Sequence, residues 1–353
     1  MPDASQPEGA GADDASIPGA DATTGPGAGR AGPGADGDEG SGSRTAYLVY
    51  RSLGTAMQKL PEPVAAGAAA AVAVALSATR SGARAMYERH IRRVVGPGLS
   101  EAEVTAYTRR AFLSYARYWL EGARLPVLSA DVVADRMLIE SGWEHLVTGM
   151  EAGNGVIMAL PHIGSWEWGG SWLALQGYPM TSVAEPLEPP EMYEWFVAQR
   201  EAMGLTIVPL GSGASGVLLR TLRAGKLVGL LCDRDIGGNG VEVEFFGERT
   251  TMPGGPAMLA LRTGAVVLPT AVYSGPGREH TAVIMDPVPI ERTTSLRDDV
   301  SRVTQQIARD LEELIRRAPE QWHVFQPNWP SDLTGPDVGE PGTAGGTLGG
   351  SAA

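Results

Sequence analysis

The feature that most constrains the fold is an alternation of short apolar runs with helical segments that begins after Gly155. Runs typical of strands occupy 156–160, 181–184, 205–210, 227–232, 241–246, 266–272 and 282–285. Helices are expected at 165–176, 190–203, 214–224 and 253–263, followed by a long amphipathic helix at 295–317. This alternation predicts an α/β fold, with a mixed, mostly parallel central sheet flanked by helices. Ligands of such sheets lie at the carboxyl ends of the strands.

A helical region precedes this pattern. Helices are expected at 46–60, 63–79, 81–94 and 100–124, so residues 45–125 form a helical preface to one domain that spans 45–330. The apolar segment 64–78 is 15 residues long, too short for a hydrocarbon core of ~30 Å. It is either a buried core helix or an interfacial helix. Flanking arginines favour membrane-associating N-terminal helices.

The two ends of the chain differ in composition from the rest. Residues 1–44 and 331–353 consist largely of small and polar residues, so we expect a disordered acidic N-terminal tail and a disordered C-terminal tail. The tails hold most of the net charge of −13, and residues 45–330 keep only about −4 of it. Residues 45–93 are basic, and we expect them to touch an anionic membrane surface. Their charged residues are Arg51, Lys59, Arg80, Arg84, Arg89, Arg92 and Arg93 against Glu62 and Glu88.

Several classes of function are disfavoured by composition. Cys232 is the only cysteine, which excludes an intrachain disulfide and a cysteine-based metal site. The histidines other than His162 show no metal-ligand spacing, so no metal is expected. Aromatic residues do not interleave with a basic stripe, so no nucleic-acid partner is expected. Residues 1–44 contain no hydrophobic segment typical of a signal peptide, and we expect a cytosolic location.

The candidate for chemistry is His162. It follows the apolar run 156–160, and Glu167 lies five residues later on the first turn of the expected helix. A histidine at the carboxyl end of a strand can take a proton from a hydroxyl near neutral pH, while a carboxylate holds its tautomer. This spacing is also compatible with a buried structural histidine.

Four motifs in order give the pattern a context. They are Leu-Pro-His-Ile-Gly-Ser-Trp-Glu at 160–167, Asp-Arg-Asp at 233–235, Gly-Val-Glu-Val-Glu-Phe-Phe-Gly-Glu at 240–248 and Met-Pro-Gly-Gly-Pro at 252–256. Over residues 45–330 the chain resembles the bacterial lipid A biosynthesis acyltransferases, most closely the actinobacterial branch that acylates phosphatidylinositol mannosides.

The resemblance implies a glycerolipid acyltransferase-like fold and a peripheral enzyme on the cytoplasmic face of the plasma membrane. It implies transfer of a long-chain acyl group, palmitoyl being expected, from acyl-CoA or an acyl carrier protein to a mannose hydroxyl of phosphatidylinositol mannoside. Acyl-CoA is then a substrate, no cofactor is needed, and an apolar tunnel holds the acyl chain. The alternatives are an acceptor of the lipid A type and a non-catalytic lipid-binding protein.

The resemblance also implies a His–Glu dyad whose acid comes from the strand at 241–246. Side chains two apart in a strand share a face, so Glu242 and Glu244 point the same way. We expect Glu244, or else Glu242, to orient His162, and Glu167 to brace the site. The alternative is that both carboxylates lie on an ordinary strand face that is exposed to solvent.

Four further residues form the expected substrate-binding set. The resemblance implies that Glu185 and Arg200 line the entrance, and we add Thr250 and Arg234. A guanidinium suits an anionic head group. The alternatives are a surface position for Arg200 and, because Arg234 stands between two aspartates, a structural ion-pair cluster.

A glycine motif offers a competing interpretation. Gly211-x-Gly213-x-x-Gly216 follows the run 205–210 and opens the helix at 214–224, and Asp233 ends the next strand. This order is typical of a dinucleotide-binding turn with its ribose-binding acid, hence of an oxidoreductase. In a milder form, the glycine amides would meet a phosphate of CoA.

Overall fold

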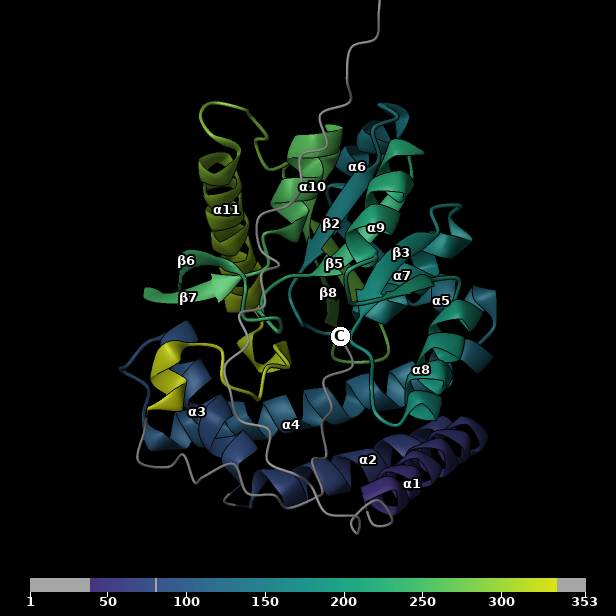
Figure 1. Cartoon of the computed structure of the whole chain (residues 1–353). Helices are drawn as coiled ribbons and strands as arrows, with labels where there is room; N and C mark the ends of the chain where they lie inside the picture. The colour runs from purple at the N-terminus through teal and green to yellow at the C-terminus, as the bar shows by residue number, and fades with distance from the viewer. Residues whose placement is uncertain (1–38, 80, 335–353) are drawn as a thin grey trace, which may run out of the picture.

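The computed structural model describes residues 39–79 and 81–334, and the expected disorder of residues 1–38 and 335–353 lies outside the described residues. Figure 1 shows the arrangement. The α-helices are α1 (Glu39–Lys59), α2 (Glu62–Ser77), α3 (Gly82–Val95), α4 (Glu101–Arg124), α5 (Ala130–Asp135), α6 (Trp143–Glu151), α7 (Trp166–Leu175), α8 (Pro190–Ala202), α9 (Ala214–Arg223), α10 (Gly255–Thr263) and α11 (Leu296–Arg317). The strands are β1 (Met137–Ser141), β2 (Val156–Leu160), β3 (Met180–Ala184), β4 (Thr206–Pro209), β5 (Leu227–Leu231), β6 (Val241–Phe245), β7 (Glu248–Met252), β8 (Val266–Ser274) and β9 (His280–Ile284).

The central sheet has seven strands in the order β1-β9-β8-β2-β5-β3-β4. Neighbouring strands are parallel except for the β8–β9 hairpin, which is antiparallel. The predicted mixed, mostly parallel sheet flanked by helices is therefore confirmed. β2 lies at its centre between β5 and β8, as expected for a strand that is apolar throughout and buried on both faces.

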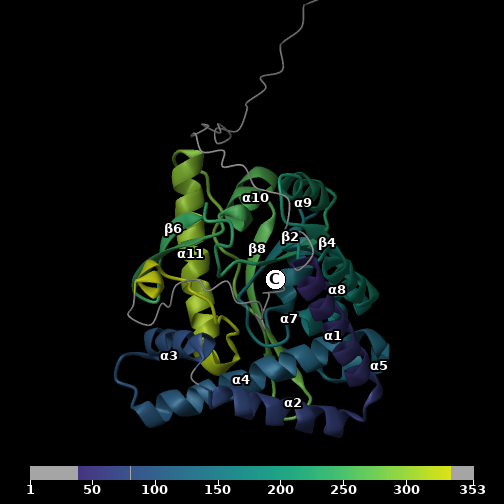
Figure 2. The ribbon, with the colours of Figure 1, turned by 60° about the horizontal axis from the view of Figure 1, so that its bottom comes forward.

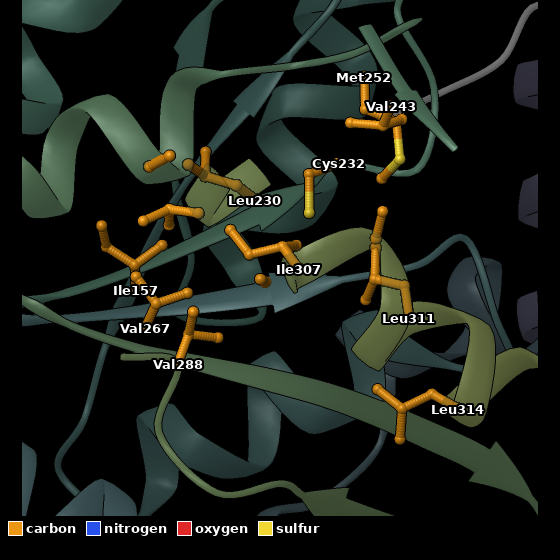
Figure 3. Close-up of a cluster of buried hydrophobic side chains, with 14 of the residues drawn as sticks. Ile157, Leu230, Cys232, Val243, Met252, Val267, Val288, Ile307, Leu311 and Leu314 are labelled. Atoms are coloured by element: carbon orange, nitrogen blue, oxygen red, sulfur yellow. The ribbon is translucent and has the colours of Figure 1, made fainter. Parts of the chain in front are cut away.

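The sheet separates two hydrophobic cores. Ile157 and Ala159 of β2 belong to the core under α9, α10 and α11, whereas Met158 and Leu160 belong to the core that contains α7. Alternate side chains of one strand thus hold both layers together. Figure 3 shows the first core, in which Ile157 and Ile307 of α11 both take part.

Helices α1–α4 form a separate layer, with α1 and α2 lying beside α4 in Figures 1 and 2. The apolar segment 64–78 is not a buried core helix, because α2 buries only the small residues Ala65, Ala73 and Ser77. Among the described residues no single helix is long and apolar enough to cross a bilayer, although the bent pair of α2 and α3 meets that length and composition test together. Large aliphatic side chains are exposed along α1 and α2 instead: Leu48, Val49, Leu53, Val64, Val72 and Leu76, with Leu60 between the helices.

The structure differs from the sequence prediction in several elements. The run 241–246 is a strand, but it forms a separate hairpin with β7 that packs on α11 and does not join the central sheet. The strands β1 and β7 and the helices α5 and α6 were not predicted. At the boundaries, α1 begins at Glu39, and residues up to Leu333 are ordered in a short 3-10 helix in which Asp332 is buried.

Candidate active site

His162 and Asp233 meet at the carboxyl edge of the sheet because their strands are in register. β2 and β5 are parallel neighbours with Leu160 opposite Leu231, and each strand is followed after two positions by one of the two polar residues. Parallel strands in register carry equivalent positions side by side. The sequence thus delivers a histidine and an aspartate to the same point from segments 71 residues apart.

The Asp233 carboxylate orients the His162 ring. Its Oδ1 lies 2.5 Å from Nδ1 of His162, and its Oδ2 accepts the His162 amide at 2.9 Å and Nε1–H of Trp322 at 2.7 Å. Burial alone would raise the pKa of Asp233, but the adjacent His162 ring and the accepted hydrogen bonds outweigh burial and lower it. Asp233 is therefore a buried carboxylate anion whose lone pairs are occupied by fixed donors.

This pairing assigns the tautomer of His162. A carboxylate only accepts hydrogen bonds, so Nδ1 carries the proton and Nε2 carries the lone pair. Nε2 is buried without a hydrogen-bond partner among the described residues. It belongs to a residue that lines a largely aromatic pocket formed with Tyr115, Tyr118, Trp119, Trp166, His323 and Gln326. An unpartnered imidazole lone pair in such a pocket is suited to accept a proton from a bound hydroxyl.

The C-terminal segment fixes the turn that carries His162. The carbonyl of His162 accepts the amide of His323 at 2.7 Å, and the amide of Gly164 donates to the carbonyl of Gln321 at 3.0 Å. Gly164 has a φ of +57°, and a Cβ there would lie 2.0 Å from the carbonyl oxygen of Val272. Only glycine fits this close approach, so the turn after β2 has one backbone path.

A second histidine in the pocket stays neutral. Nε2 of His323 lies 2.9 Å from Oγ of Ser114. Burial and the neighbouring charge of protonated His162 lower the pKa of His323 to about 3. When His162 takes up a proton, His323 therefore remains uncharged, and the pocket carries a single base near neutral pH.

Comparisons with known proteins show the family of the chain. The sequence profile of the bacterial lipid A biosynthesis acyltransferases matches residues 43–331. The chain belongs to that family. It is 36% identical over 297 residues to a phosphatidylinositol mannoside acyltransferase of Mycolicibacterium smegmatis, covering 83% of this chain and 94% of the relative.

Two further relatives show how sequence identity varies among similar proteins. A phosphatidylinositol mannoside acyltransferase of Mycobacterium tuberculosis is 40% identical over 228 residues, which cover 63% of this chain and 69% of that protein. A lipid A biosynthesis acyltransferase of Haemophilus influenzae is 29% identical over 184 residues, or 51% and 55% of the two chains. This member of the lipid A biosynthesis acyltransferase family is thus similar to proteins named for two different acceptors.

The predicted partner of His162 was wrong. Glu242 and Glu244 are exposed on the β6–β7 hairpin, where Glu242 pairs with Arg249. The backbone of Glu244 is bonded to Gln305 of α11. The prediction that the two carboxylates share one strand face is confirmed, but Val243 and Phe245 take the inward face, so the carboxylates point away from the core. Nδ1 of His162 is satisfied by Asp233 instead.

Glu167 and Arg200 form a buried ion pair. Nε and Nη2 of Arg200 lie 2.9 Å and 2.8 Å from Oε1 of Glu167, and neither side chain is exposed. Arg200 also lies over the ring of Trp166, which lines the pocket of His162. Glu167 therefore sits at the helix start as expected and braces the pocket wall through Arg200. The alternative of a surface arginine is wrong, and binding of substrate by Arg200 stays a prediction.

The other expected substrate residues are spread around the carboxyl edge. Glu185 directly follows β3 and is half-buried, and Arg234 directly follows Asp233. Thr250 is buried on β7, and its hydroxyl donates to the carbonyl of Asn328, whose side-chain amide donates to the carbonyl of Asp233 at 3.1 Å. Thr250 is thus a support behind the site, while roles for Glu185 and Arg234 in substrate binding stay predictions.

The glycine motif does not lie where a dinucleotide turn requires. Gly211, Gly213 and Gly216 follow β4, which is the outermost strand of the sheet. β3 lies between β4 and β5, so Asp233 is not on the neighbouring strand and is already bonded to His162. A ribose-binding acid has to stand at the end of the strand next to the motif. The geometry therefore speaks against the oxidoreductase interpretation.

Three functional contacts were missed in the sequence. Asp233 carried a signal, because the run Leu-Leu-Cys-Asp after an apolar strand repeats the pattern Ala-Leu-Pro-His that ends at His162. Trp322 and Asn328 carried none, because they lie near the C-terminus outside any strand. Only the fold brings them to Asp233.

Proposed function

We propose that this protein is a membrane-bound glycolipid acyltransferase that moves a palmitoyl group from acyl-CoA to a mannose hydroxyl of phosphatidylinositol mannoside. The observation that carries the proposal is the base-competent Nε2 of His162, oriented by Asp233 in a chain of this acyltransferase family. The names of the Mycolicibacterium and Mycobacterium relatives support the acceptor.

The proposed reaction is a direct transfer. Nε2 of His162 removes the proton of the mannose hydroxyl while its oxygen attacks the thioester carbonyl, forming the C–O bond. The C–S bond then breaks, and the leaving CoA thiolate takes the proton from the imidazolium. Asp233 stays ionised throughout and stabilises the imidazolium, which its lowered pKa supports. No metal or redox step is needed to balance the reaction.

A second, largely apolar pocket supports the acyl chain part of the proposal. It lies between α7 and the sheet and is lined by residues that include Met158, Leu160, Gly170 and Met180. Trp166 lines this pocket and also the pocket of His162, so one side chain is common to both. The pocket has a volume of only about 20 Å³. In the proposed complex the thioester therefore lies beside His162, and its chain runs past Trp166 and pushes apart the side chains that line the apolar pocket.

Membrane binding is proposed through the α1–α2 layer. Exposed aliphatic side chains such as Leu53, Val64 and Val72 would enter the interfacial region. The basic charge of residues 45–93 contributes less than its sum indicates, because Arg92 and Arg93 of α3 form ion pairs with acids outside this range. We therefore propose that peripheral binding to the cytoplasmic face of the plasma membrane depends mainly on apolar contact.

The test is an acyl-transfer assay on the full chain. Purified protein is incubated with labelled palmitoyl-CoA and phosphatidylinositol mannoside in mixed micelles, and lipid products are identified by mass spectrometry. We expect a singly acylated mannolipid, and loss of this product in His162→Ala with the thermal unfolding midpoint kept. Full activity of His162→Ala would overturn the mechanism.

Two parallel arms separate the alternatives. Replacing the acceptor by a lipid A precursor tests the relationship to the Haemophilus relative, and replacing the donor by acyl carrier protein tests the thioester carrier. Product only from the lipid A precursor would overturn the proposed acceptor. Binding of both lipids without any transfer would favour a non-catalytic lipid-binding protein.

A further inference from the structure

A third cavity lies apart from the pocket of His162. It has a volume of about 340 Å³ and is bounded by the start of α2, the last turns of α4, Trp168 of α7 and the β8–β9 turn. Four arginines line it: Arg117, Arg124, Arg136 and Arg278. We call it the arginine cavity.

The arginine cavity and the pocket of His162 use different faces of α4. An α-helix turns by about 100° per residue, so positions 115, 118 and 119 share one face and positions 117, 120, 121 and 124 share the opposite one. The first set, Tyr115, Tyr118 and Trp119, lines the pocket of His162, and the second, Arg117, Leu120, Glu121 and Arg124, lines the arginine cavity. A ligand in the cavity would therefore not be the reacting group.

The four guanidinium groups exceed the carboxylates that line the cavity. Glu62 pairs with both Arg136 and Arg278, at 3.2 Å and 3.1 Å, and Glu121 pairs with Arg117 at 2.6 Å. This leaves an excess of two positive charges among the lining residues. Glu279 lies beside Gly277 at the edge of the cavity and offsets part of this excess.

The guanidinium of Arg124 has no carboxylate partner among the described residues. Its Nη1 donates to the carbonyls of Met57 and Leu60 at 2.5 Å and 2.8 Å, and within residues 39–79 and 81–334 it forms no ion pair. Arg278 is about half exposed, so its pair with Glu62 is weakened by water. These two arginines are the groups most available to an incoming anion.

The rest of the cavity wall is apolar. It is formed by Pro63 and Ala66 of α2, Leu120 of α4, Leu128 and the ring of Trp168. A free inorganic anion gains nothing from such a wall, whereas an amphiphile covers it with its hydrocarbon part. Guanidinium groups are the preferred partners of phosphate oxygens.

The surroundings indicate where such an amphiphile comes from. The helix that forms one wall, α2, also carries the exposed side chains Val64, Val72 and Leu76. We propose that the arginine cavity binds an anionic phospholipid, with its phosphate at Arg124 and Arg278 and its glycerol and first methylenes on the apolar wall. The site takes lipid as a ligand and not as the group that reacts at His162, so it stands independently of the proposed reaction.

The probe is dihexanoyl phosphatidylglycerol below its micelle concentration, titrated into the full chain by calorimetry. The Arg124→Gln/Arg278→Gln variant should weaken binding at least tenfold. Arg109→Gln, an exposed arginine on the same helix outside the cavity, should leave the Kd unchanged, and so should His162→Ala. Unchanged binding by the double variant would overturn the proposal.

Arg124 also holds the end of α1 through its hydrogen bonds to Met57 and Leu60, and the double variant removes these bonds. A second variant therefore keeps all four arginines of the cavity. Ala66→Trp fills the cavity from an exposed position on α2 and should abolish binding while the unfolding midpoint is kept. Retained binding in Ala66→Trp would count against the cavity as the site. Equal binding of dihexanoyl phosphatidylcholine would show that the cavity does not recognise the negative charge of the lipid. Equal competition by inorganic phosphate would show that the cavity binds free anions and not lipids.

Discussion

Replacing Asp233 by asparagine tests the central geometric claim. The asparagine amide has one acceptor atom where the carboxylate has two. The Oδ2 position faces two fixed donors, the amide of His162 and Nε1–H of Trp322, so the asparagine oxygen takes that place. Its NH2 group then faces Nδ1 of His162, which has to become an acceptor, and the imidazole proton moves to Nε2.

The consequence for the rate follows from this tautomer change. With a proton on Nε2 the imidazole no longer accepts the proton of the acceptor hydroxyl, and the imidazolium also loses the neighbouring negative charge. A wrong-tautomer histidine in a comparable acid–histidine pair loses about 10⁴ in kcat. We expect kcat to fall by roughly 10³ to 10⁴, which is about 4 to 5.5 kcal/mol of activation free energy. KM should change little, because Asp233 is fully buried and does not line the pocket.

The assay is steady-state transfer from palmitoyl-CoA, with Glu242→Gln and Glu244→Gln as matched controls. Both controls remove one carboxylate, as Asp233→Asn does, but from exposed positions on the hairpin. They should keep near wild-type kcat. Circular dichroism and the urea midpoint confirm that each variant is folded. The reasoning would be refuted by a folded Asp233→Asn that keeps more than a tenth of kcat, or by a loss in Glu244→Gln of similar size.

Three further predictions concern the supports of the site and the pH dependence of stability. Trp322→Phe removes one charge-assisted hydrogen bond from Asp233, so kcat should fall by about 10- to 100-fold with KM kept, and an unchanged kcat would contradict this. Arg200→Met leaves Glu167 buried and unpaired and should lower the free energy of unfolding in urea by about 3–5 kcal/mol, most of which Glu167→Leu should restore in the double variant. Burial raises the pKa of Asp310 to about 6, so its folded state holds a proton that the unfolded chain releases, and stability declines as pH rises through 6. Asp310→Asn should therefore raise the free energy of unfolding by about 1–2 kcal/mol at pH 7.5, after allowance for partial exposure, and should leave it unchanged at pH 4. An equal increase at both pH values would count against the raised pKa.

Most of the central sheet could be predicted because its strands are apolar and buried on both faces. The expected run 156–160 coincides with β2, and the others lie within two residues of β3, β4, β5, β8 and β9 at their starts. β1 was missed because none of its side chains is buried and Leu138 is exposed, whereas the other edge strand, β4, contains the buried Val208. The apolar pattern of a strand reflects its burial, and β1 has little burial to reflect.

The site was half predictable for a different reason. His162 was found because the strand, the turn and the helix start are contiguous in sequence. Its partner was not, because pairing depends on which strand lies next to β2 and in which register. Glu244 was favoured by its motif, but β6 does not belong to the central sheet and forms a hairpin with β7 that packs on α11. Sequence pattern gives the face of a strand but not its neighbour.

Helix α4 joins the two parts of the molecule whose roles are proposed here. Glu121 lines the arginine cavity, and its Oε2 accepts the hydroxyl of Ser165 at 2.6 Å, three residues after His162. The same oxygen lies 3.0 Å from Nε2 of His280, whose ring stacks on Trp168 in the cavity wall. Burial alone would raise the pKa of Glu121, but the neighbouring His280, Arg117 and the Ser165 hydroxyl outweigh burial and lower it. The ionised carboxylate therefore holds the start of α7 to α4 near neutral pH. Arg117 pairs with the other oxygen of the same carboxylate, so Glu121 connects the arginine cavity to Ser165, in the turn that carries the base.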